Sequence, residues 1–463
     1  MFRTRRPLAA AAGLTCHFVS GSNGSSTVGG CTTSPPKLSL GTSSKLAAGG
    51  SKFETLEGVK FRIFERQSSG APLVRVLLKD LLHDLTAPPV RLVLFGEDHG
   101  HPLCHRLEKD IYDTWLGRNG YAKEGVQEPD SSSSSCNDGS VAETEEIGTV
   151  ALSLEMLSTE RQGVADEYVG LGLEPKPLQR YVDAKAAKEQ GGDASKGDEE
   201  AAMEDAEALF GGEWHNWRDY APLVRSARRH GQRIVCANAP RRLTSIVSKG
   251  GAPALDQHLA PDSAAAAAQP RDDRRLLPPL PLRRPSENLI QKIGPLFETF
   301  RGEKDLARRD RMLLAQSLWD ATMAHAIVGE LVDPKGSNRL HNRATLMSLQ
   351  PGTGDSPPAQ TGGVSPAVSK VMHVCGRLHV EHFLGVFEHL THYQEIASLR
   401  QRPPSDSSSA SRKQFSMEDR EQTRVVVCLP SDESTSLTDK ELATNPYLVN
   451  AADFVVICEE CSS

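Results

Sequence analysis

Two motifs in the sequence place a histidine three residues after a glycine, directly behind an apolar run. Residues 92–95 (LVLF) lead into 96–99 (GEDH), and residues 371–375 (VMHVC) lead into 376–379 (GRLH). A further apolar run ends in Glu155. Glycine lets a chain turn sharply as it leaves a strand, imidazoles and carboxylates bind Mn, Fe or Zn, and imidazole exchanges protons near neutral pH. These residue types indicate a metal site or an acid–base site.

Short apolar runs alternate with helical patterns along most of the chain. The pattern predicts an α/β fold with a mostly parallel central sheet flanked by helices on both faces. The predicted strands are 60–64, 91–96, 149–155, 233–239, 371–376, 424–430 and 453–458. The predicted helices are 102–117, 159–169, 219–230, 304–330 and 379–392.

Ligands of such sheets bind outside the carboxyl ends of the strands. Glu97, His99, Glu155 and His379 all follow predicted strands, so we expect their side chains to line one site. A separation of His99 and His379 greater than roughly 12 Å would exclude a shared metal.

Two further segments are candidates for ligand binding. On the predicted helix 379–392, His382 and His389 share a face away from the apolar stripe, which makes His382 a candidate. In the segment 237–242 (ANAPRR), Pro240 favours a helix start, and Asn238 or Ala239 would be its cap. The free amides there, with Arg241 and Arg242 beside them, predict an anion site.

Composition argues against two classes of protein. The chain has 463 residues, 24% of them charged, and a formal net charge of −7, which argues against a nucleic-acid-binding surface. No run approaches the roughly 18 apolar residues that a membrane-spanning helix needs. We expect no nucleic-acid partner and no transmembrane segment.

The first 53 residues differ from the rest of the chain. They contain no acidic residue, several Arg and Lys, and many Ser, Thr, Gly and Ala. This composition predicts an organelle transit peptide, for a plastid rather than a mitochondrion. The alternative is a secretory signal, since PLAAAAGL is a short apolar core behind basic residues.

Low-complexity segments divide the remaining chain. Polar, Pro-rich or Ser-rich composition predicts insertions that cannot bury a core, near 128–147, 184–207, 249–286 and 351–367. We expect one α/β domain over 54–400, a linker at 401–423, and C-terminal strands at 424–463 that complete the sheet.

Cysteine usage does not predict a disulfide framework. Cys236, Cys375 and Cys428 lie inside apolar runs, where free cysteine behaves as a small buried hydrophobe. Cys458 and Cys461 have the spacing of a zinc knuckle, but no second such pair completes four ligands.

Five motifs occur in the order seen in a known family. The sequence resembles the ChaN-like haem-binding uptake family, grouped with the Tiki and TraB proteins, over roughly residues 60–395. The segments that carry the resemblance are VLFGEDH, LSLEM, YAPLVRSARRHGQRIVCANAPRR, QSLWDATMA and VCGRLHVEHFLGV. The residue sequence GLTC at 13–16 does not form the lipid-anchor box of bacterial relatives, which argues against an anchored uptake role.

The resemblance implies a site made of the paired Gly-x-x-His motifs and acidic residues. One expected function is haem binding in organellar haem or iron handling, with haem or another small anionic ligand as partner. The alternative is a metal-dependent hydrolase with a divalent cation such as Mn, Fe or Zn. A third possibility is a scaffold without either chemistry. A homodimer is also possible. Positions carried over from the family are Gly96, Glu97, His99, Glu155, Gly376 and His379. In the hydrolase, His99, Glu155 and His379 would hold the metal, and Glu97 would be the catalytic base.

Overall fold

The computed structural model of this chain divides into two compact units, Met1–Glu54 and Thr55–Ser463. The predicted transit peptide at 1–53 lies outside the described residues. The structure describes residues 54–56, 59–117, 149–170, 206–207, 209–210, 214, 216–260, 273–301, 306–332, 368–401, 421–430 and 437–458.

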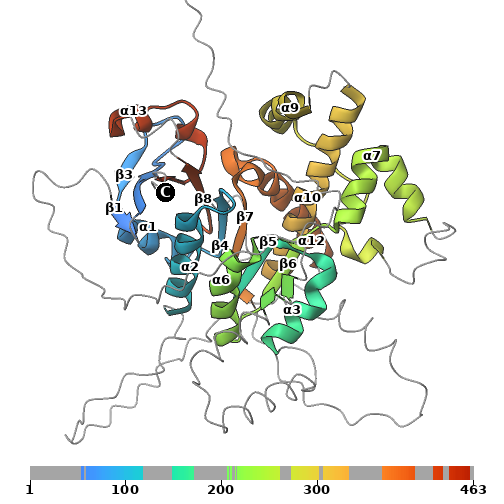
Figure 1. Cartoon of the computed structure of the whole chain (residues 1–463), viewed down its shortest axis with the longest axis horizontal. Coiled ribbons are helices and arrows are strands. Elements are labelled where there is room, and N and C mark those ends of the chain that lie inside the picture. Colours follow the sequence, from blue (N-terminus) through green and yellow to red (C-terminus); the bar gives the residue numbers. More distant parts are fainter. Residues whose placement is uncertain are drawn as a thin grey trace, which may run out of the picture. The chain divides into compact units, whose positions relative to one another are not determined.

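A nine-stranded sheet forms the centre of the described fold (Figure 1). The strand order is β1-β2-β9-β8-β4-β7-β5-β6, with β3 beside β2. The six strands from β9 to β6 are parallel, and β2 pairs antiparallel with β9 and with β3. The predicted α/β fold with a mostly parallel sheet is confirmed. The strands are β1 Glu54–Leu56, β2 Val59–Glu65, β3 Val74–Val76, β4 Leu92–Glu97, β5 Thr149–Ser158, β6 Ile234–Asn238, β7 Val368–Gly376, β8 Thr423–Pro430 and β9 Phe454–Cys458.

Each face of the sheet has its own hydrophobic core. Along β4, Val93 and Phe95 pack with helices α1, α2, α3 and α6, whereas Leu92 and Leu94 pack with α10 and α12. Successive side chains of a strand point to opposite faces, so strands covered on both sides are apolar throughout. The helices are α1 Leu78–Leu85, α2 Pro102–Leu116, α3 Gln162–Val169, α6 Trp217–Arg229, α7 Arg241–His258, α9 Glu287–Arg301, α10 Leu306–Val332, α12 Val386–Gln401 and α13 Asp439–Ala443.

The predicted helix 379–392 is wrong in its first half. Two short 3-10 turns precede α12, because His382 and Phe383 have φ angles of 62° and 58° and Gly385 has a φ of 60°. A Cβ atom on Gly385 would lie 2.5 Å from the carbonyl oxygen of His379. Glycine permits both the φ angle and this close approach, and His379 therefore lies in a tight turn directly after β7.

The predicted insertion at 249–286 is wrong at both of its ends. Helix α7 continues to His258, and Leu255 and Leu277 are buried with Leu318 of α10. The leucines that lie among the Pro, Ala and Arg residues of this segment therefore form a small hydrophobic core with α10. The predicted insertions at 128–147, 184–207 and 351–367 and the linker at 401–423 lie almost wholly outside the described residues.

Within the part of the chain that the structure describes, no helix combines the length and the apolar content needed to span a bilayer.

Candidate functional site

Three neighbouring strands bring the predicted site residues to one edge of the sheet. Strands β4 and β7 pair in parallel, with Glu97 opposite Gly376, and β5 lies on the other side of β7. The register between β5 and β6 shifts between Leu154 and Ser158, so Glu155 stands at an irregularity of the ladder. Its Oε2 accepts a 2.7 Å hydrogen bond from the Gly376 amide.

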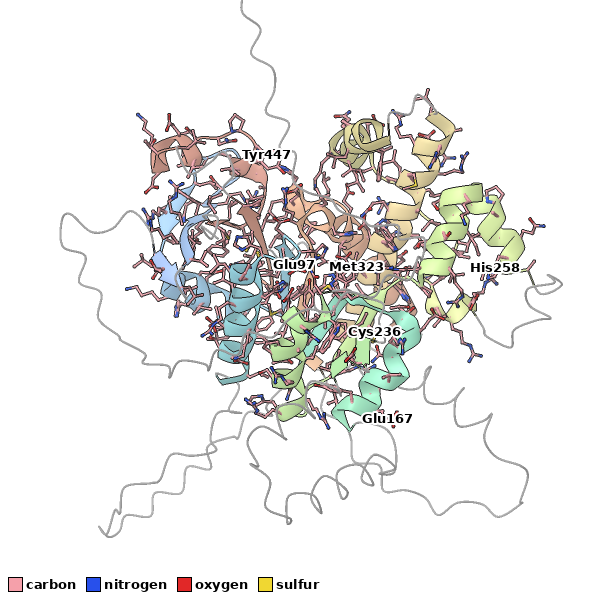
Figure 2. All side chains as sticks on the ribbon, viewed as in Figure 1. Glu97, Glu167, Cys236, His258, Met323 and Tyr447 are labelled. Carbon is pink, nitrogen blue, oxygen red and sulfur yellow. The ribbon has the colours of Figure 1, made fainter. Side chains whose placement is uncertain are left out.

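Glu97 is the centre of a first buried group. The Nδ1 atom of His99 lies 2.7 Å from Glu97 Oε1, and the Tyr220 hydroxyl donates to the same oxygen. On the other side, His105 Nδ1 lies 3.2 Å from Glu97 Oε2 and 3.3 Å from Glu108 Oε2. Figure 2 places Glu97 in the interior of the described ribbon.

Two buried carboxyl groups in this first group hold protons more tightly than usual. Burial, and then the charge of Glu108, raises the pKa of Glu97 to about 8. Burial raises the pKa of Glu108 to about 8 as well. Two adjacent buried carboxylates would repel each other, and a bound proton relieves this repulsion.

The His99 imidazole is stabilised as a cation. Burial alone would lower the pKa of His99, but the hydrogen bond to Glu97 and the charges of Glu97 and Glu155 raise it to about 9. The side chain is 34% exposed, and its ring lies edge-on to Trp214 at 5.0 Å between centroids.

His379 is the centre of a second buried group. Its Nδ1 lies 2.5 Å from Asp320 Oδ1 on α10, and its Nε2 lies 3.3 Å from Glu155 Oε1. Burial opposes the charge of His379, but the two carboxylates raise its pKa well above the ordinary value. Burial would likewise raise the pKa of Glu155, yet His379 and His99 lower it below the ordinary range. The group is therefore an imidazolium held between two carboxylates.

The two groups meet at Gly376. A Cβ atom there would lie 2.8 Å from His99 Nε2, while the Gly376 amide binds Glu155 and Glu155 binds His379. The charge of His379 also acts on His99. Glu97, His99, Glu155 and His379 are thus linked through Gly376 by a chain of contacts, and the single cavity that the sequence predicts stays a prediction. Their roles toward a metal or a ligand stay predictions.

Replacing Gly376 by alanine should displace His99. The backbone φ of Gly376 is −58°, which alanine adopts without strain, so the effect comes from the overlap with His99. Overpacking of this kind costs about 1–3 kcal/mol. Gly294→Ala in α9 is the control, because nothing lies within 4 Å of a Cβ at that position and alanine favours a helix by up to about 1 kcal/mol. Thermal unfolding of the two variants checks the difference, and equal shifts would contradict it.

Gly96 is the second glycine required by close packing. A Cβ atom there would lie 2.7 Å from Val380 and 2.9 Å from the Cα atom of Arg377. The two Gly-x-x-His turns therefore pack against each other through their glycines.

The structure separates His382 from this site. The His382 ring packs against Tyr447 at 4.6 Å between centroids, and Figure 2 shows Tyr447 apart from Glu97. The helix face that His382 was expected to share with His389 does not form, because the backbone breaks before α12. The structure gives no support to His382 as part of the strand-end site.

The structure shows how the residues of the predicted anion site are arranged around the start of α7, and their role toward an anion stays a prediction. Pro240 itself is the cap residue, and Asn238, at the end of β6, keeps a buried Oδ1 without a hydrogen-bond partner. Arg242 is bound by Glu160 and Asp273, whereas Arg241 is exposed. Arg241 is therefore the cation of this pair that could reach an anion.

Sequence reasoning missed several partners of the site. Tyr220 belongs to the apolar stripe of the predicted helix 219–230, and nothing in that stripe predicts where its hydroxyl points. A signal existed for the others, because residues three or four apart share a helix face. One such pair is His105 with Glu108. The other is Gln316 with Asp320, and both of these side chains contact His379.

Comparisons with known proteins found a similar solved structure and a matching family model. A solved structure described as cofacial haem binding to ChaN of Campylobacter jejuni is similar over 86% of this chain and 97% of that chain, with 13% identity and a TM-score of 0.45. No curated protein matches the chain. The family model for haem-binding uptake proteins of the Tiki superfamily, ChaN, matches residues 86–343, more than half of the 463 residues. The chain therefore belongs to the ChaN-like haem-binding uptake family of the Tiki superfamily.

Proposed function

We propose that this chain binds haem at the carboxyl ends of β4, β5 and β7, in the haem or iron handling of an organelle. Family membership supports the ligand class, and one observation supports the proposed place. Among the histidines of the strand-end groups, His99 has a side chain that is 34% exposed, whereas those of His105 and His379 are 9% exposed.

The surroundings of His99 fit a porphyrin. Its Nδ1 is held by the Glu97 carboxylate, and a second partner of this kind orients an imidazole toward a metal. The Trp214 ring beside it supplies an aromatic surface. When bound, haem would bring an iron atom that an imidazole can ligate. Arg241 is the proposed partner of a propionate.

The comparisons give no support to the metal-dependent hydrolase, because the family model that matches is that of haem-binding uptake proteins.

Haemin titration of the purified chain tests the proposal. A saturable shift of the Soret band at about one equivalent per chain is expected, and His99→Ala should weaken binding by at least tenfold. His83→Ala, an exposed position on α1, is the matched control. Non-saturating adsorption would remove the haem proposal, and unchanged binding by His99→Ala would remove His99 from it.

The proposed location has a separate test. Residues 1–53 fused to a fluorescent reporter should direct it into a plastid, because the segment is basic and free of acidic residues. A cytosolic or secreted reporter would contradict the proposal.

A further inference from the structure

Three buried thiols and an imidazole gather beside the strand-end site. Cys104 lies in the first turn of α2, and His101 is the residue that caps this helix. Cys428 belongs to β8 and Cys458 ends β9. The three cysteines are at most 1% exposed, and none of the five described cysteines forms a disulfide. We call these four residues the Cys3His cluster.

The cluster is compact. One ring nitrogen of His101 and the Sγ atoms of Cys104 and Cys458 lie within 4.8 Å of one another. The Cys428 thiol is within hydrogen-bonding reach of both other thiols. Zn–S bonds of 2.3 Å in a tetrahedral site correspond to sulfur atoms about 3.8 Å apart. His101, Cys104 and Cys458 are therefore already close to the spacing of a shared cation, and Cys428 stands beside two of these three as the fourth ligand.

Two features argue against ordinary core packing. A hydrophobic core accepts a single buried thiol, but here three thiols meet each other, and Cys104 is more than 300 residues from the other two in sequence. The His101 ring is within hydrogen-bonding reach of Cys104, yet its buried Nδ1 atom has no hydrogen-bond partner among the described residues. A buried polar atom of this kind is costly unless a partner is supplied.

We propose that His101, Cys104, Cys428 and Cys458 bind one zinc-class divalent cation in a closed structural site. Three thiolates and one imidazole form a donor set typical of structural zinc, and sulfur ligands select it over magnesium or calcium. Binding releases three thiol protons to solvent, and His101 ligates as the neutral ring.

The site would connect parts of the fold that the family model does not join. Cys104 lies inside the matched region 86–343, whereas Cys428 and Cys458 lie beyond it. A cation held by all four residues would fasten β8 and β9 to the start of α2. It would also restrain the turn that carries His99, two residues before His101.

Cobalt substitution of the full chain, without added haem, tests this proposal. The reduced, metal-free protein should take up about one equivalent of Co²⁺, with thiolate-to-cobalt charge-transfer absorption and the d–d bands of tetrahedral cobalt; Zn²⁺ should displace it. Cys458→Ser and Cys104→Ser should lose the charge-transfer band. Cys236→Ser is the matched control, because Cys236 is 2% exposed and lies on β6. Glu155→Gln should keep the band as well.

X-ray absorption of the zinc-loaded wild-type chain needs no variant and should count three sulfur ligands and one nitrogen. Failure of the reduced protein to bind cobalt or zinc, or a cobalt spectrum without sulfur ligands, would overturn the proposal. Loss of metal in Glu155→Gln with retention in Cys458→Ser would place the cation at the strand-end groups and overturn it too. Haem binding has its own readout and is judged separately.

Discussion

Replacing Asp320 by alanine should lower the free energy of unfolding by about 3–5 kcal/mol, because removal of one partner leaves a buried charge uncompensated. Asp320 is fully buried and its Oδ1 lies 2.5 Å from His379 Nδ1. Without it, Glu155 is the one carboxylate that still contacts the imidazolium. Chemical denaturation at neutral pH measures the effect.

Asp110→Ala is the control for Asp320→Ala. Asp110 forms a 2.9 Å ion pair with Arg106 on the same helix, with about a quarter of each side chain exposed. A partly exposed pair of this kind contributes less than about 1 kcal/mol. If both alanine variants lower the free energy of unfolding by less than about 1 kcal/mol, the buried group around His379 does not carry a charge at neutral pH.

Unfolding of the wild-type chain should become easier as the pH rises from about 5 to 8, and Glu108→Gln should reduce this dependence. Burial raises the pKa of Glu108 from an ordinary 4.5 to about 8 in the folded chain. The folded state therefore holds a proton that the unfolded state has released. The stability is complete below the unfolded pKa and is lost as the pH rises through the folded pKa.

Glutamine has the shape of the protonated acid and does not titrate. The stability of Glu108→Gln relative to wild type should grow across this window by at most about 1.4 kcal/mol per pH unit. Denaturation curves at several pH values check the slope, with Glu167→Gln on the exposed side of α3 as control (Figure 2). Parallel curves for wild type and Glu108→Gln would show that Glu108 is ionised throughout.

Much of the sheet was predictable because its central strands are buried on both faces. Residues 92–95 are four consecutive apolar residues, and residues 371–375 are apolar except for one histidine. Both runs form strands. The short strands β1 and β3 were missed, since three residues at an edge carry too little pattern. The helix at 379–392 was misassigned because Val380 and Phe383 keep an apolar spacing through a segment whose backbone has positive φ angles.

The site was predictable as far as the strand ends define it. Glu97, Glu155 and His379 follow from the rule on parallel sheets, but Tyr220 and Asp320 come from helices. Which helix covers which strand end depends on the order of strands, and that order is not a local property of the sequence. The thiol contacts were missed for the same reason, since β8 and β9 reach α2 only through the sheet.

The position of β9 has a consequence for how the protein is made. The last strand of the chain lies between β2 and β8, and β4 lies between β7 and β8. Strand β4 therefore has neither neighbour when it leaves the ribosome. Roughly 330 residues separate Glu97 from Pro430, the end of β8, and their synthesis takes about 17–67 s at 5–20 residues per second. During this time the edges of β4 and the acidic side chain of Glu97 are without the strands that cover them in the fold, and unpaired strand edges of this kind are prone to aggregation.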